Sequence, residues 1–206
     1  MLQILKYGNT NTYYIANEDV GILVDTDWAG TLSAFYKEIK TKNITLEKIK
    51  YLIVTHYHPD HMGLASELME LGILLVVMDI QQEYISFPDG IFAKDKRLSY
   101  TPINLENAII ISCSESRTFL KRLGIDGEII HTPGHSDDSI SLILDSGTAI
   151  VGDLCPLGSV LAYNDDILIN SWNEILSRDL KIVYYGHAKE SNVSGIRSIE
   201  EYKYLV

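Results

Sequence analysis

The sequence has few cysteines and no long apolar run. Only two of its 206 residues are cysteine, Cys113 and Cys155. Two thiols are too few for a disulfide framework and fit a reducing compartment. No apolar stretch reaches the roughly 18 residues that a membrane helix needs, and the N-terminus lacks the basic start and apolar core of a signal peptide. We therefore expect a cytoplasmic protein with no membrane partner.

Basic residues are also scarce. The chain carries 17 Lys and Arg against 28 Asp and Glu, which gives a formal net charge of −11. A nucleic-acid-binding protein needs a basic face, so we expect a small-molecule substrate and no nucleic-acid partner, while the oligomeric state stays unknown. Apolar residues, in contrast, make up 46% of the chain. This is enough for the packed core of a single domain over residues 1–206.

Hydrophobic patterns typical of strands and of helices follow one another along the chain. Apolar runs bounded by turn residues predict strands at residues 2–7, 12–16, 21–25, 51–55, 73–78, 128–131, 139–144, 148–151 and 181–185. Helical spacing predicts five helices, each with apolar residues on its buried face. These residues are Phe35 in the first helix, Leu68 and Leu71 in the second, Leu120 in the third, Trp172 in the fourth and Ile199 in the fifth. A capping box at Ser171 is expected to start the fourth helix. The strands form two groups with helices attached. We therefore expect an α/β protein in which two sheets pack together with helices outside.

Three of the six histidines fall within one short segment, His56-Tyr57-His58-Pro59-Asp60-His61, directly after a predicted strand. Residues two apart in an extended loop point to the same side, so His56 and His58 can bind one metal ion. Asp60 and His61, one step further on, can face a neighbouring ion. Imidazole and carboxylate are ligands of Zn²⁺ and similar ions, and a set without cysteine is not typical of a closed structural zinc site. The segment predicts a catalytic metal site.

Three later segments each present one more residue of these types after a predicted strand. They are Thr-Pro-Gly-His at His135, Gly-Asp at Asp153 and Gly-His at His187. Taken alone, a Gly-His pair is typical of a turn histidine and a Gly-Asp pair of a helix cap, and for His187 and Asp153 these alternatives would be favoured. In this order after the His-rich segment, we interpret all three as metal ligands. His131 has no ligand role in this pattern and is predicted to be a strand-end residue.

These motifs resemble those of the metallo-β-lactamase superfamily over residues 21–189, and they most resemble its small glyoxalase-II-like hydrolases. The resemblance implies a four-layer αββα sandwich with metals at one rim. It also implies a set of ligands: His56, His58 and His135 for one ion, Asp60, His61 and His187 for a second, and Asp153 as a bridge. Asp60 and Asp153 are the carboxylates that we predict to be catalytic. Asp25 matches the first motif of the family and is expected to support a ligand, a strand-end turn being the alternative.

The function that the resemblance implies is hydrolysis. Two divalent ions, zinc first and iron or manganese as alternatives, share a water and lower its pKa to about 7. The resulting metal-bridging hydroxide would attack a small ester, thioester or related substrate. Members that hydrolyse glutathione thioesters carry a further C-terminal helical segment, whereas 19 residues follow His187 here. We therefore expect a substrate other than a glutathione thioester.

Two other functions remain open. A mononuclear iron dioxygenase that acts on persulfides needs only two histidines and one carboxylate. A non-catalytic sensor module could also hold a metal. The presence of the second-ion ligands Asp60, His61 and His187 favours the hydrolase over both.

Residues 87–100 show neither a helical nor a strand period and are predicted to be a loop over or beside the site. Lys94, Lys96 and Arg97 cluster there, and we hypothesise that they bind an anionic or polar part of the substrate. A solvated surface loop is the alternative. Asp137 and Asp138 follow the Pro-Gly-His turn, where they either lie near the metals or are solvated, and solvation is favoured.

Overall fold

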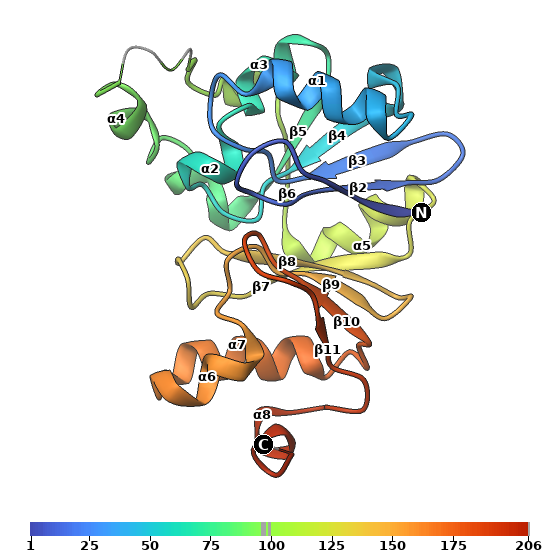
Figure 1. Cartoon of the computed structure of the whole chain (residues 1–206), viewed down its shortest axis with the longest axis vertical. Coiled ribbons are helices and arrows are strands. Elements are labelled where there is room, and N and C mark those ends of the chain that lie inside the picture. Colours follow the sequence, from blue (N-terminus) through green and yellow to red (C-terminus); the bar gives the residue numbers. More distant parts are fainter. Residues whose placement is uncertain (96–97, 99, 206) are drawn as a thin grey trace. The chain divides into compact units, whose positions relative to one another are not determined.

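The computed structural model describes residues 1–95, 98 and 100–205. Lys96 and Arg97, two of the three predicted substrate-binding residues, lie outside them. The chain forms two compact units, residues 1–112 and 113–206. Each unit contains one sheet and its own helices (Figure 1). Among the described residues, no helix combines the length and the apolar character that crossing a membrane requires.

The N-terminal unit is built on a six-stranded sheet in the order β1-β2-β3-β4-β5-β6. Its strands are β1 (Leu2–Leu5), β2 (Thr12–Ala16), β3 (Gly21–Val24), β4 (Ile49–Ile53), β5 (Leu74–Met78) and β6 (Ile109–Ile111). The first three pair antiparallel, and β3 to β6 pair parallel. Because β3 and β4 run in the same direction, their carboxyl ends lie at one edge of the sheet. Asp25 follows β3 there, and the His-rich segment follows β4.

Helices supply the crossovers between the parallel strands of this unit. They are α1 (Leu32–Thr41), α2 (Pro59–Met62), α3 (Ala65–Glu70) and α4 (Asp89–Phe92), with 3-10 turns η1 (Leu46–Lys48), η2 (Asp79–Tyr84) and η3 (Leu105–Asn107). Phe35 of α1 and Leu68 of α3 are fully buried in one core with Leu23 and Leu52 of the sheet. Each such side chain contributes about 1.5–3 kcal/mol to folding. This core holds the ligand-bearing edge in place.

The C-terminal unit has a five-stranded sheet in the order β11-β10-β9-β8-β7. The strands are β7 (Gly127–His131), β8 (Ile140–Leu144), β9 (Thr148–Ile150), β10 (Ile182–Tyr184) and β11 (Ser191–Asn192), and the helices are α5 (Cys113–Arg122), α6 (Leu157–Tyr163), α7 (Asp166–Leu176) and α8 (Ile199–Lys203). Figure 1 shows α6 and α7 along one face of this sheet, where Trp172 and Ile175 share a core with Ala149 and Val183. Only β9 and β10 pair parallel. Their carboxyl ends therefore share one edge.

All nine predicted strands are present, with boundaries shifted by at most two residues. Two more strands, β6 and β11, were missed because runs of three and two residues carry too little pattern to detect. The helix α6 was missed as well. The helix expected to start at Ser171 begins at Asp166 instead, because the Asp165 side chain accepts hydrogen bonds from the backbone N–H groups of Ile167 and Leu168 and caps it there.

Two further expectations about the N-terminal unit are wrong. Leu71 does not point inward. The helix α3 ends at Glu70, so Leu71 falls on its C-cap and is 43% exposed. Residues 87–100 are not entirely irregular, since they contain α4, and Phe92 of that helix is buried between Trp28 and Tyr100. A four-residue helix is too short to show a periodic pattern.

Candidate metal centre

The N-terminal unit gathers four candidate ligands within six residues. The side chains of His56 and His61 are buried, at 1% and 0% exposure, whereas His58 is half-buried. His56 Nε2 lies 3.1 Å from His58 Nδ1. Two nitrogen ligands of one tetrahedral zinc ion stand roughly 3.3 Å apart, given Zn–N bonds of about 2.05 Å. The two rings are thus spaced to share an ion. Asp60 and His61 also have ligand atoms within 4.8 Å of each other.

Asp25 orients both buried histidines through hydrogen bonds, directly to His61 and through Thr55 to His56. Its Oδ2 lies 2.9 Å from His61 Nδ1 and accepts a hydrogen bond from Thr55 Oγ1 at 2.8 Å. The Thr55 hydroxyl donates its only hydrogen there, so it accepts from His56 Nδ1 at 3.1 Å. Both rings therefore carry their proton on Nδ1 and present a lone pair on Nε2. This is the arrangement by which outer hydrogen bonds orient metal-binding histidines.

The backbone around α2 is fixed as firmly as the rings. Thr10 Oγ1 donates to the carbonyl of Asp60 at 2.7 Å, and the N–H of Thr26 donates to the carbonyl of His61 at 2.8 Å. Gly63, just after α2, lets the chain pass close to its neighbour: a Cβ at Gly63 would stand 2.3 Å from the backbone nitrogen of Ala29. Neither threonine was predicted from the sequence: Thr26 directly follows Asp25, but Thr10 has no candidate ligand near it in the chain.

The C-terminal unit gathers the other three candidates around one carboxylate. Asp153 Oδ2 lies 3.8 Å from His135 Nε2 and 3.4 Å from His187 Nε2. Asp153 and His187 follow the parallel strands β9 and β10, and His135 follows β7, which runs in the same direction as β9. All three therefore project from the same edge of the sheet. Their side chains are 17–38% exposed.

Backbone turns, one of them anchored by the buried side chain of Ser171, hold this second cluster. Gly152 has φ +57°, which lets the chain turn sharply before Asp153, and the N–H of Gly186 donates to the carbonyl of Gly152 at 2.7 Å. The ligand-bearing turns after β9 and β10 are thus tied together. Ser171 Oγ of α7 donates to the carbonyl of Pro133 at 2.6 Å and anchors the turn that carries His135.

A hollow of about 280 Å³ opens beside this second cluster. Besides His135, Asp153 and His187, it is lined by Gly152, Leu154, Pro156, Tyr185 and Ala188, so no described Lys or Arg lies in its wall. The buried Tyr185 hydroxyl has its pKa raised by desolvation and donates to Ser191 Oγ. Desolvation also raises the pKa of the half-buried Cys155 thiol.

The remaining predicted residues fall in varied places. His131 ends β7, and its Nε2 is hydrogen-bonded to the carbonyl of Asp137. Asp137 is exposed, but Asp138 is 2% exposed, so the expectation that both are solvated is wrong for Asp138. Lys94 is exposed. In the same segment, the ring of Phe87 lies 5.7 Å from that of His58, which places residue 87 beside the N-terminal cluster.

Comparison with known proteins fits this geometry. Residues 5–187 match the family model of the metallo-beta-lactamase superfamily. The chain therefore belongs to that superfamily.

Individual relatives agree with this assignment. The chain is 28% identical to a probable metallo-hydrolase of Methanocaldococcus jannaschii, over 92% of this chain and 93% of that protein. It is 26% identical to an atrochrysone carboxyl ACP thioesterase of a Cryptosporiopsis species, over 68% of this chain and 36% of that longer protein. Among solved structures, a metallo-beta-lactamase family protein from Thermus thermophilus matches with a TM-score of 0.70 at 18% identity, over 100% of this chain and 78% of that chain. The metallo-β-lactamase fold expected from the motifs is thus confirmed.

Proposed function

We propose that this protein is a dinuclear metal hydrolase, with zinc as the metal, that acts on a small ester, thioester or related substrate. The observation that carries the proposal is the hydrogen-bond network of Asp25, Thr55, His56 and His61. It presents two imidazole Nε2 lone pairs from a buried, rigid edge. A structural polar loop has no need for such outer hydrogen bonds, whereas a metal centre depends on them.

The proposed ligand set combines the two clusters. One ion would be held by His56, His58 and His135, and the other by Asp60, His61 and His187, with Asp153 between them. These ligand atoms fit zinc ions, because imidazole nitrogens and carboxylate oxygens, without a thiolate, are the usual ligands of zinc in catalytic sites. Seven ligands are more than one zinc ion can use, which is why two ions are proposed.

When bound, two such ions supply an activated water and polarise the oxygen of the electrophile. The chain's own residues then have distinct tasks. Asp25 and Thr55 keep the protons of His61 and His56 on Nδ1. Asp60 and Asp153, the proposed catalytic carboxylates, offset the positive charge of the centre. No serine or cysteine nucleophile is required by this chemistry.

The wall of the hollow beside His135 and His187 favours an uncharged acyl group. Leu154, Pro156, Tyr185 and Ala188 offer apolar surface, and in the part of the chain that the structure describes no cationic side chain lines this wall to bind a carboxylate. A thioester or ester with an apolar acyl part fits these surroundings. The thioesterase among the relatives supports this substrate class.

Elemental analysis tests the metal content. Protein purified without added metal should contain close to two zinc ions per chain. One iron per chain, together with oxygen consumption on a persulfide, would replace the hydrolase by a dioxygenase. No bound metal, with no metal taken up on dialysis, would contradict both.

A substrate screen tests the reaction. The purified protein should hydrolyse a thioester or ester faster than a phosphodiester or a β-lactam. In a series of acyl N-acetylcysteamine thioesters, kcat/KM should rise about fourfold per methylene, because burying one CH₂ contributes about 0.8 kcal/mol. Pro156→Asp should flatten this dependence while the metal content stays unchanged. Ser159→Asp, on the exposed surface of α6 and outside the hollow, is the matched control.

A further inference from the structure

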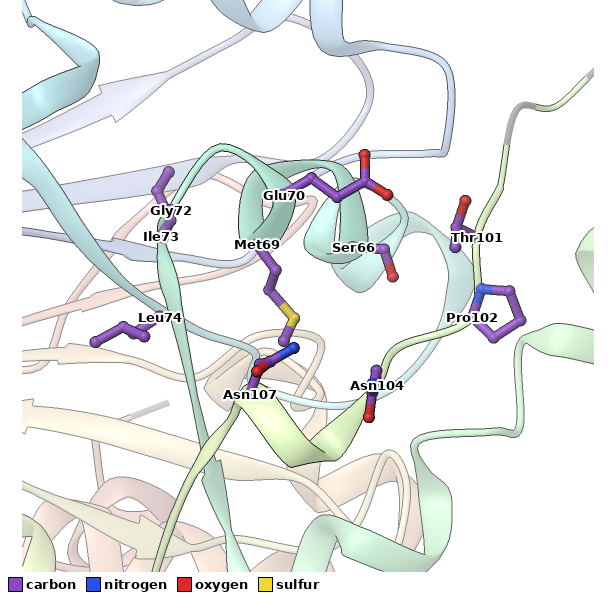
Figure 2. Close-up of a pocket in the computed structure, with 10 residues that line it drawn as sticks. All are labelled: Ser66, Met69, Glu70, Gly72, Ile73, Leu74, Thr101, Pro102, Asn104 and Asn107. Carbon is purple, nitrogen blue, oxygen red and sulfur yellow. The ribbon is translucent and has the colours of Figure 1, made fainter.

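A second cavity lies in the N-terminal unit, and none of the candidate metal ligands lines it. It has a volume of about 300 Å³, at the lower end of the range for small-molecule sites. One side is formed by α3 and the start of β5, and the other by the segment from Thr101 to Asn107 (Figure 2). The hydrolase proposed above makes no use of this cavity.

Ser66 is the residue that points to a ligand. It is 7% exposed, its hydroxyl is buried, and among the described residues Ser66 Oγ has no hydrogen-bond partner. Burying a hydroxyl without a hydrogen-bond partner is unfavourable, because the hydrogen bonds that it made to water are lost. Figure 2 shows this side chain directed from α3 into the gap that Thr101 and Pro102 close on the far side. A polar group of a ligand in this gap would satisfy the hydroxyl.

The polar and apolar sides of the cavity are separate. In Figure 2 the side chains of Ser66, Glu70 and Thr101 lie at the end of the cavity next to the Thr101–Pro102 segment, whereas Met69 and Leu74 lie toward its other end. Leu74 is 42% exposed, so apolar surface there remains open. Among the residues that the structure describes, the lining includes one anionic side chain, Glu70, and no cationic one.

We propose that this cavity binds a small amphipathic organic cation, a primary ammonium group on an apolar body. An ammonium has three N–H donors and no acceptor. Ser66, Glu70 and Thr101 supply three oxygens that can accept them. The apolar body would lie on Met69, Ile73 and Leu74.

A neighbouring carboxylate adds to the negative potential. Burial raises the pKa of Glu67, and the charge of Glu70 raises it further. The two carboxylates are thus close enough to repel each other. A cation bound at Glu70 would relieve this repulsion, whereas an anion would increase it.

Hexylamine at pH 7, where an alkylamine is protonated, is a suitable probe for the metal-loaded full chain. Hexanol and hexanoate are the matched uncharged and anionic compounds. Titrations followed by backbone amide chemical shifts should give a dissociation constant for hexylammonium at least about tenfold lower than for hexanol. The shifts should centre on Ser66, Glu70 and Thr101. Equal binding of all three compounds, or shifts centred on the histidine clusters, would overturn the proposal.

Variants separate binding from folding. Ser66→Ala should weaken hexylammonium binding about threefold to tenfold, yet leave the melting temperature unchanged or slightly higher, because the lost hydroxyl has no partner among the described residues. Glu70→Gln should weaken binding by a similar factor. Glu47→Gln, exposed on η1 and outside the cavity, is the control and should change nothing. Unchanged binding in both cavity variants would also overturn the proposal.

Discussion

The two units of the chain place their candidate ligands by the same topological device but hold them differently. In the first, Asp25 and the candidate ligands that it supports follow the parallel strands β3 and β4, and in the second, Asp153 and His187 follow the parallel strands β9 and β10. The N-terminal ligands are held by a buried network of side chains around Asp25. The C-terminal ligands are partly exposed and rest on backbone turns. The first cluster is therefore preorganised for metal binding, and the second is more open to solvent and substrate.

The largest effect is expected from removing a ligand of the preorganised cluster. His58→Ala should abolish activity and lower the metal content, because the ring of His58 is spaced to share an ion with His56. His131→Ala should keep both, since His131 ends a strand and bonds a backbone carbonyl. Elemental analysis and a hydrolysis assay on the two variants measure this difference. Loss of a full equivalent of metal in the His131 variant would show that the sixth histidine is misassigned.

The next largest effect should come from the outer hydrogen bonds of the first cluster. Asp25→Asn removes a carboxylate that serves His61 and Thr55, and the metal should bind about 10–100-fold more weakly. Competition with a chromophoric chelator measures the affinity. Asp19→Asn changes an exposed aspartate of the same unit and should leave the affinity unaltered. Equal affinities in both variants would mean that Asp25 only shapes the turn after β3.

A smaller effect on metal affinity is expected from Ser171, whose hydrogen bond anchors a ligand-bearing turn in the C-terminal unit. Ser171→Ala removes one neutral hydrogen bond to the carbonyl of Pro133, so the free energy of unfolding should fall by about 1 kcal/mol. Metal affinity should fall less than in the Asp25 variant. Ser177→Ala, at the exposed end of the same helix, serves as the control. A loss of affinity in Ser171→Ala as large as in Asp25→Asn would contradict the proposed contrast between the clusters.

The smallest effect is expected from the three basic residues of segment 87–100, whose place near the site is a prediction from the sequence. Replacing Lys94, Lys96 and Arg97 together by serine should raise KM a few-fold for an anionic or polar substrate, with kcat altered less, if these residues hold ground and transition states alike. Metal content should not change. The same replacement of three lysines on α1 and at its C-cap, Lys37, Lys40 and Lys42, controls for net charge. Unchanged KM at low salt would exclude a role in substrate binding, since screening could not then hide an electrostatic contribution.

The fold class and the candidate ligands could be predicted from local sequence patterns. Strand periodicity located nine of the eleven strands, and the dense spacing of His56, His58, Asp60 and His61 singled out one segment before any contact was known. Local chemistry suffices there because the ligands of the first cluster are neighbours in the chain. Helix boundaries could not be predicted as well. The start of α7 at Asp166 depends on which of several possible N-cap residues caps the helix, and the sequence pattern does not distinguish these residues.

The residues that support the ligands could be identified only from tertiary contacts. Asp25 and Thr55 are 30 positions apart, and Asp25 and His61 are 36 apart, yet parallel pairing of β3 and β4 brings them into hydrogen-bond contact. Ser66 and Leu71 show the same limit. Helical spacing predicts which residues share a face of a helix. Whether a hydroxyl on that face is hydrogen-bonded, or a leucine there is buried, depends on segments distant in sequence that pack against the face.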